Sequence, residues 1–161
     1  MTKNHEQGVS RRAVLGGMAA SGALGLAGGL FPGVAAAEEM QAIARRVVAI
    51  DDVPTDQHDW GTLKWLVNAK RFPGADQTVG IAQILPGKGN PVHYHPNCEE
   101  VLYMISGRGR HSLGDETIEL TPGMAIHIPQ DARHNMVNAG WETIICLVTF
   151  SSGDRQTVFL K

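Results

Sequence analysis

Residues 87–107 read GKGNPVHYHPNCEEVLYMISG, in which two histidines and a pair of acids precede an apolar run. His93 and His95 are two residues apart, so their side chains would lie on the same face of a β-strand. The turn residues 96–99 allow the chain to reverse direction. Glu100, at the start of the next strand, can then point to the same place. The spacing therefore predicts that His93, His95 and Glu100 converge.

A second stretch, residues 123–138, reads GMAIHIPQDARHNMVN and contains another turn that opens into a strand at His134. Three neutral imidazoles and one carboxylate are a suitable ligand set for a divalent transition metal. Glu99 is an alternative carboxylate one position earlier. Neighbours on a strand point in opposite directions, and Glu100 is favoured because its distance to Gly107 fits the pattern described next.

These two stretches resemble the two sequence motifs of the cupin family. The first motif is matched at every fixed position by Gly87-x5-His93-x-His95-x4-Glu100-x6-Gly107. The second is matched by Gly123-x5-Pro129-x-Asp131-x2-His134-x3-Asn138, except that Asp131 replaces a glycine. Aspartate tolerates turn conformations, so this departure is a mild one. The resemblance implies a small antiparallel jelly-roll β-barrel, a metal held by His93, His95, Glu100 and His134, and a homodimer.

The rest of the chain also predicts an all-β domain. Short apolar runs separated by Gly, Pro, Ser and Asp turns are typical of a sandwich or barrel. The predicted strands cover residues 63–67, 78–85, 100–105, 108–113, 117–120, 125–128 and 143–150. Gly114-Asp115 is a strong hairpin signal between two of them. Leu102, Met104 and the run from Ile144 to Phe150 are expected in the core.

Composition narrows the class of protein. The 161 residues include 43% hydrophobic and 19% charged residues, and 14 Lys and Arg stand against 16 Asp and Glu. A net charge of -2 gives no basic surface for nucleic acid, which we exclude as a partner. Two cysteines cannot form a disulfide scaffold. Cys98 and Cys146 could form one pair in an oxidising compartment, but small buried apolar side chains are the favoured reading.

Residues 1–37 have the pattern of a cleavable export signal. Arg11 and Arg12 precede an uncharged run from Ala13 to Ala37 that is rich in Gly and Ala. The run is too weakly hydrophobic for a retained membrane anchor, and the twin arginines resemble the motif for export of folded proteins. We therefore predict a twin-arginine-type signal at 1–37, a linker or short helix at 38–55 and a cupin domain at 56–161. The mature protein would be periplasmic or secreted, with no stable membrane insertion.

The ligand set does not select one metal by itself. Zn, Ni and Cu are compatible with it, but a protein folded before export can acquire its metal in the cytoplasm, which favours Fe or Mn. The predicted function is a metal-dependent, dioxygenase-like oxidoreductase acting on a small oxygen-rich substrate. Glu100 could also serve as a catalytic base. A non-oxidative lyase or isomerase, and a ligand-binding module without catalysis, remain open alternatives.

Several other polar residues have two readings. His111 and His127 are predicted on the outer face or bonded to a neighbour, rather than as inward proton shuttles. Gln83 could bond a substrate. The arginines considered for a substrate carboxylate are Arg108, Arg110 and Arg133, with surface solvation as the default. Trp60 and Trp65 are expected at a barrel edge or a dimer interface.

Overall fold

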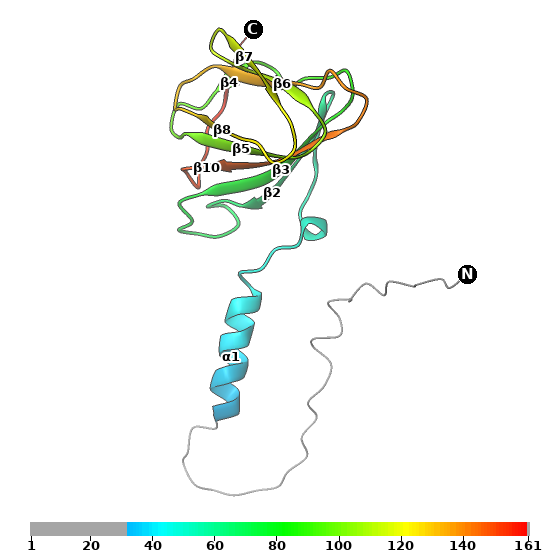
Figure 1. Cartoon of the computed structure of the whole chain (residues 1–161). Helices are drawn as coiled ribbons and strands as arrows, with labels where there is room; N and C mark the ends of the chain where they lie inside the picture. Colours follow the sequence, from blue (N-terminus) through cyan, green and yellow to red (C-terminus); the bar gives the residue numbers. More distant parts are fainter. Residues whose placement is uncertain (1–31, 161) are drawn as a thin grey trace, which may run out of the picture. The chain divides into compact units, whose positions relative to one another are not determined.

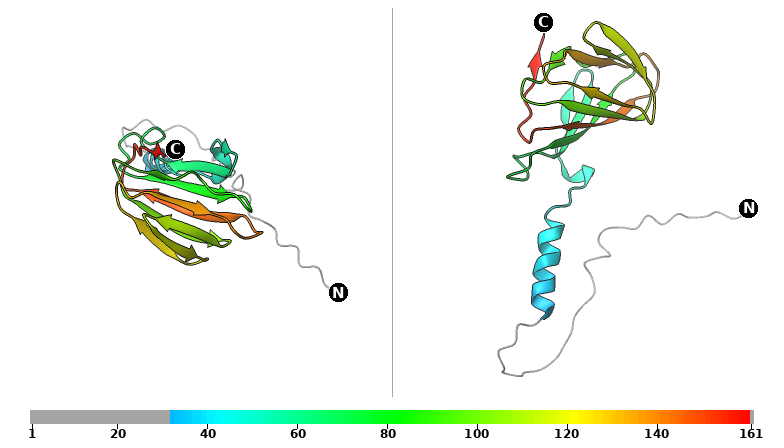
Figure 2. Two further views of the ribbon diagram at one scale, coloured as in Figure 1. Left: turned by 90° about the horizontal axis from the view of Figure 1, so that it is seen from above. Right: turned by 60° about the vertical axis from the view of Figure 1, so that its left-hand side comes forward.

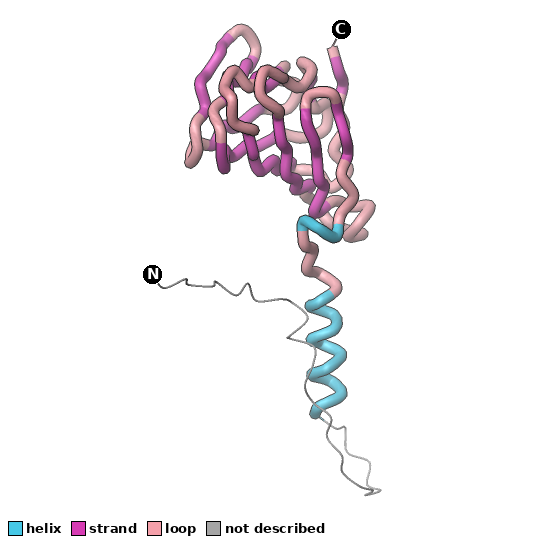
Figure 3. The backbone as a smooth tube through the Cα atoms, turned by 90° about the vertical axis from the view of Figure 1, so that its right-hand side faces the viewer, coloured by secondary structure: helices cyan, strands magenta, loops and turns pink. Residues whose placement is uncertain are grey.

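A computed structural model describes residues 32–160 of the chain. Helix α1 covers Pro32–Ala44, and a single turn of 3-10 helix, η2, covers Ile50–Asp52. The strands are β1 (Asp56–His58), β2 (Gly61–Val67), β3 (Thr78–Ile84), β4 (His93–Tyr94), β5 (Glu100–Ser106), β6 (Gly109–Leu113), β7 (Glu116–Leu120), β8 (Ala125–Ile128), β9 (His134–Val137), β10 (Ile144–Phe150) and β11 (Val158–Phe159). Figure 3 shows strands and loops making up almost all of the barrel, and the strands lie between residues 56 and 159, so the predicted all-β class is confirmed.

The strands form two antiparallel sheets that face each other as the walls of a barrel (Figure 1). One sheet has the order β1-β2-β3-β10-β5-β8, and the other has the order β11-β4-β9-β6-β7. Strands far apart in sequence are therefore neighbours. The left view of Figure 2 shows strands of the larger sheet lying side by side. This is the jelly-roll arrangement that the sequence predicts.

Alternating side chains fill the space between the sheets. Along β3, β5 and β10 every second residue is buried, as expected for strands with one face toward a core. Met104 and Ile144 are fully buried, and Leu102 and Phe150 are 5% exposed, so the predicted core positions are confirmed. Within the apolar run of β10, the intervening residues are only partly buried.

The turn residues of the two motifs have the backbone conformations that the sequence requires. Gly107 has a φ of +79°, and a Cβ there would lie 2.8 Å from the Cα of Ile144. Asp131, which replaces the motif glycine, has a φ of +62° and is the one non-glycine residue with positive φ among those described. Gly114 and Asp115 connect β6 to β7 in the predicted two-residue hairpin, with Leu113 opposite Glu116.

Two short edge strands and one helix differ from the sequence prediction. β1 and β11 were not expected, because two or three residues carry no readable alternation. Helix α1 begins at Pro32 and continues past Ala37, the predicted end of the export signal. Most of that signal lies outside the described residues, and cleavage stays a prediction. Between residues 32 and 160, no helix combines the length and the apolar character that crossing a bilayer requires.

Candidate metal centre

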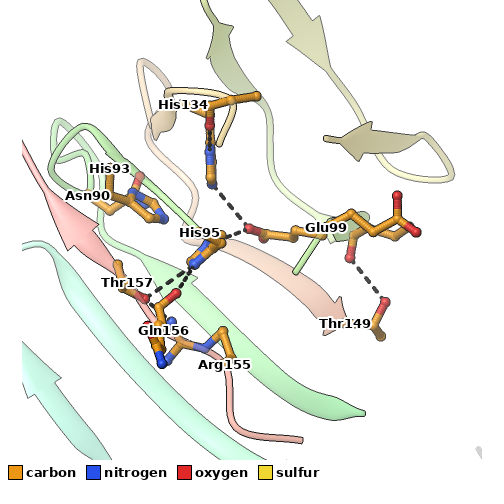
Figure 4. A network of polar contacts seen from close by, with 12 residues as sticks. Asn90, His93, His95, Glu99, His134, Thr149, Arg155, Gln156 and Thr157 are labelled. Carbon is orange, nitrogen blue, oxygen red and sulfur yellow. Dashed lines mark hydrogen bonds and ion pairs between the residues drawn. The ribbon is translucent and has the colours of Figure 1, made fainter. Parts of the chain in front are cut away.

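The four predicted ligand residues meet inside the barrel. His93 lies in β4, His95 follows it directly, Glu100 begins β5 and His134 begins β9. β4 pairs with β9 so that His93 is opposite His134, which brings together two motifs about 40 residues apart in sequence. One ligand atom from each residue lies within 4.8 Å of all the others, and all four side chains are buried. Figure 4 shows His95 and His134 pointing at a common carboxylate.

Backbone carbonyls fix the orientation of all three imidazole rings. The Nδ1 atoms of His93, His95 and His134 lie 2.9, 2.7 and 2.9 Å from the carbonyl oxygens of Pro91, Gln156 and Ala132, respectively. A carbonyl oxygen can only accept, so each Nδ1 must carry the proton. Nε2 is then the ring nitrogen that each histidine offers to a cation in the interior. This pattern of outer hydrogen bonds is typical of histidines that bind a metal.

The carboxylate of Glu100 completes the cluster. Its Oε2 lies 3.1 Å from Nε2 of His95 and 3.1 Å from Nε2 of His134. Burial alone would raise the pKa of Glu100, but the contacts with His134 and then His95 outweigh it and lower the pKa to about 2. Once unprotonated, the same Nε2 atoms and the carboxylate oxygen are metal ligands, so a cation bound among them would take the place of the shared protons. The donor set fits a divalent metal ion.

Glu99, the alternative carboxylate, lies on the outside. Its Oε2 accepts a hydrogen bond from Nε2 of His127 at 2.8 Å, and both side chains are more than half exposed. The structure therefore places Glu100 in the four-residue cluster and Glu99 outside it, and His127 lies on the outer face as expected.

Burial also keeps His93 neutral. Desolvation, followed by the nearby His134, lowers the pKa of His93 to about 4. An imidazole that is neutral near pH 7 can bind a metal without first losing a proton. His93 is thus ready to bind a cation without a change in its protonation.

The metal cluster opens onto a cavity of about 420 Å³. Apolar and aromatic side chains make up most of its wall: Trp60, Leu63, Trp65, Ala82, Ile84, Leu102, Met136, Val148, Phe150 and Phe159. Trp60 and Trp65, expected at a barrel edge or a dimer interface, line this cavity. A volume of this size is typical of sites for small molecules.

His111 corrects one prediction. It was expected on the outer face or bonded to a neighbour, but it is 1% exposed, lines the cavity, and its Nδ1 has no hydrogen-bond partner among the described residues. Its ring stacks on His134, with centroids 5.8 Å apart. Desolvation and the nearby His134 lower the pKa of His111 to about 4. In the sequence of β6, Gly109, His111 and Leu113 alternate with the polar Arg110 and Ser112, and this alternation was the available signal.

Arg155 is a charged cavity residue that the sequence did not predict. It lies between β10 and β11 and lines the cavity beside the cluster. The arginines considered instead, Arg108, Arg110 and Arg133, are exposed, and Arg108 pairs with Glu119 at 2.8 Å. Gln83 does not line the cavity, and its Oε1 accepts a hydrogen bond from Thr62 at 3.2 Å.

The two cysteines are not paired. Cys98 and Cys146 are free and buried, which confirms their reading as small apolar side chains. Burial raises the pKa of Cys146 to about 12, so this thiol stays protonated although it borders the cavity. A protonated thiol is a poor metal ligand, and neither cysteine belongs to the four-residue cluster.

Comparison with known proteins agrees with this double-sheet barrel and its internal cluster of three histidines and one glutamate. The cupin domain family matches residues 80–150. The chain is 34% identical over 95 residues to protein SchB of Streptomyces halstedii, covering 59% of this chain and 69% of SchB. It is 31% identical over 103 residues to polyketide synthase CurC of Streptomyces cyaneus, covering 64% of this chain and 67% of CurC. The chain belongs to the cupin superfamily.

A solved structure gives a more distant likeness. Oxalate decarboxylase of Lactobacillus farciminis, in a formate complex, superposes with a TM-score of 0.64 at 25% identity. The match covers 68% of this chain but only 34% of the decarboxylase, so the present chain corresponds to about a third of that enzyme.

Proposed function

We propose that this cupin is a metal-dependent, dioxygenase-like oxidoreductase acting on a small oxygen-rich substrate. The observation that carries the proposal is the open cavity of about 420 Å³ beside the four ligand residues. A metal that only stabilised the barrel would need no such space, and Met or Leu side chains would fill it. Leu102 and Met136 line the wall, yet the cavity reaches all four ligands.

The ligand residues define what the metal contributes. His93, His95, Glu100 and His134 would hold one divalent ion, which supplies Lewis acidity and, as Fe or Mn, redox chemistry. The three carbonyl-bonded imidazoles keep their Nε2 atoms aimed at one point. Glu100 would bind the ion as a carboxylate anion, because its pKa is about 2. We propose that its carboxylate also accepts a substrate proton when its contact with the cluster loosens.

The apolar wall and the relatives support an aromatic or polyketide-like substrate. Trp60, Trp65, Phe150 and Phe159 provide flat surfaces for rings. CurC is a polyketide synthase protein by name, and TcmJ of Streptomyces glaucescens, 24% identical over 102 residues, is named a tetracenomycin polyketide synthase protein. Polyketide-type molecules are rich in the ketone, enol and phenol oxygens that a Lewis acid binds.

A non-oxidative lyase or isomerase is the second candidate. The likeness to oxalate decarboxylase favours it, because a decarboxylase is a lyase, and that enzyme was solved in a complex with formate. Arg155 in the cavity also suits an acidic substrate. Oxygen uptake during turnover separates the two candidates, and a complete lack of turnover would favour a binding module.

Metal analysis of the exported protein is the first experiment. We expect one Fe or Mn per chain, and less than a tenth of that content in His134→Ala, measured by elemental analysis. Protein with Fe or Mn should consume oxygen with diketones or catechols. Stoichiometric Zn or Ni without oxygen uptake would move the assignment to the lyase or isomerase. The absence of metal from the wild type would contradict the proposal.

Export and assembly are part of the same proposal. Residues 1–37 would direct a folded, metal-loaded protein to the periplasm or the medium. The homodimer implied by cupin membership stays a prediction, and light scattering coupled to size-exclusion chromatography tests it.

A further inference from the structure

The feature that the metal cluster does not explain is the guanidinium of Arg155. Its central carbon lies 4.3 Å from the ring centroid of Trp65 and 4.9 Å from that of Phe150. The charge therefore packs against two adjacent aromatic rings inside the cavity, in cation–π contact with both. The side chain is largely removed from water, and burial lowers its pKa.

Most of the hydrogen-bonding capacity of this guanidinium is unused. Nη1 donates to the hydroxyl of Thr157, and the buried Nε has no partner among the described residues. A guanidinium carries five N–H donors. None of the ion pairs found among the described residues includes Arg155. Burying a charge without a charged partner is costly, so a bound anion would stabilise this arrangement.

Both carboxylates that line the cavity already accept hydrogen bonds from other side chains. Asp56 lines the same cavity, and its Oδ2 accepts a hydrogen bond from Nε1 of Trp65 at 3.0 Å. Glu100 is held by His95 and His134. Both acids raise the pKa of Arg155 from a distance, but neither forms an ion pair with it.

The same short segment holds Arg155 next to the cluster. The carbonyl of Gln156 accepts the Nδ1 hydrogen of His95 at 2.7 Å, and the hydroxyl of Thr157 lies 3.4 Å from that Nδ1. Figure 4 shows Arg155, Gln156 and Thr157 on one side of His95. Asn97 fixes the segment, because its Nδ2 donates to the carbonyl of Asp154 at 2.8 Å and its Oδ1 accepts from the Gln156 amide at 2.9 Å.

We propose that Arg155 binds the carboxylate of an aromatic acid whose rings occupy the cavity beside the metal cluster. The guanidinium would form charge-assisted hydrogen bonds to the carboxylate through its free donors. The apolar wall would contact the rings of the acid. The single positive charge of Arg155 would balance the single negative charge of the carboxylate. This inference rests on the proposed function for the role of the cavity, and it narrows the substrate class to aromatic carboxylates.

The test compares an acid with its uncharged analogue. Isothermal titration calorimetry of the full-length, metal-loaded protein would use 2-naphthoate and 2-naphthamide as probes. We expect wild-type protein to bind the acid at least tenfold more tightly than the amide. Arg155→Met should abolish this preference, whereas Arg155→Lys, which keeps the charge but loses the planar fork, should retain only part of it.

Arg108→Met is the matched control, because Arg108 carries the same charge on an exposed side chain paired with Glu119. It should keep the wild-type preference. Equal affinities for acid and amide in the wild type would overturn the inference, even if Arg155→Met failed to fold. An unchanged preference in a folded Arg155→Met would also overturn it.

The probe experiment needs no turnover. A protein that prefers the acid through Arg155 but consumes no oxygen would keep this inference and lose the proposed oxidoreductase function. A protein that consumes oxygen but binds both probes equally would keep the function and lose the inference. A purely structural Arg155 would change the melting temperature without changing the ratio of the two affinities.

Discussion

The protons on three Nδ1 atoms decide what the centre can bind. Each is donated to a backbone carbonyl, in residues that lie two positions away for His93 and His134 and 61 positions away for His95. The first two bonds are local, so the strand sequence itself sets the tautomer. The third depends on the C-terminal segment. The metal affinity of the centre should therefore respond to residues that touch no metal.

Replacing the carboxylate tests its charge. Glu100→Gln keeps the size of the side chain but removes the anion, so we expect metal affinity to fall at least 100-fold. Competition with a chelator of known affinity measures this change. Glu99→Gln is the matched control, because Glu99 lies outside the cluster and contacts His127. A Glu100→Gln variant with wild-type affinity would exclude Glu100 as a ligand.

His111 should make stability depend on pH in the metal-free protein. Its pKa of about 4 in the folded state lies below the 6.5 of an exposed histidine. Between these values the unfolded chain binds the extra proton, so acidification destabilises the fold and the stability falls as pH drops from 6.5 to 4. The full effect is roughly 3 kcal/mol.

The variant His111→Phe should lose this contribution. Urea unfolding of both chelator-treated proteins at pH 8, 6.5, 5.5 and 4.5 gives the free energy of unfolding as a function of pH. Between pH 6.5 and 4, its slope should be smaller for His111→Phe than for the wild type by about 1.4 kcal/mol per pH unit. The pH 8 value sets the offset caused by the substitution itself. Parallel curves for the two proteins would show that His111 does not titrate as stated.

At the scale of the elements, turns and pairing place the ligands. Gly107 follows β5 where the chain passes the start of β10. Its φ is +79°, and the nearby backbone of Ile144 leaves no room for a side chain. Gly123 has a φ of +90°, but a Cβ there would meet nothing within 4 Å. A side chain at Gly123 would therefore meet backbone strain alone, whereas a side chain at Gly107 would meet both backbone strain and steric overlap.

Alanine substitutions at these turns should differ in cost. Gly123→Ala should lower the free energy of unfolding by about 1 kcal/mol through the left-handed backbone alone. Gly107→Ala should lower it by about 2 to 4 kcal/mol, because overpacking against Ile144 adds to that strain. Urea denaturation of both variants measures the difference. Equal losses would mean that β10 shifts freely to accept the methyl group.

The sequence predicted those elements whose signals are local. β3, β5 and β10 alternate apolar residues between clear turns, and the two motifs gave the ligand set. The edge strands β1 and β11 were missed because they form through pairing with β2 and β4. Arg155 was missed for a related reason. Its segment has no periodicity, and its position depends on contacts with residues far away in the sequence, among them Asn97 and His95.

For the whole molecule, the predicted export route matters most for the identity of the metal, because it decides in which compartment the protein acquires the ion. Arg11→Lys combined with Arg12→Lys should leave the protein in the cytoplasm of a bacterium that has twin-arginine transport. Cell fractionation and mass spectrometry of the exported form, expected to begin at Glu38, measure this. Unchanged export of the double variant would indicate a general secretion signal and would remove the argument for cytoplasmic Fe or Mn.

The pairing of β11 with β4 places Phe159 opposite His93, and the Gln156 carbonyl supports His95. Residues 156–159 follow all four ligands in the sequence and are thus needed to complete the centre. Until these residues have left the ribosome, His93, His95, Glu100 and His134 have been translated but His95 lacks its support. Metal capture should therefore follow the emergence of residues 156–159, and a nascent chain stalled before residue 155 should hold the ion weakly.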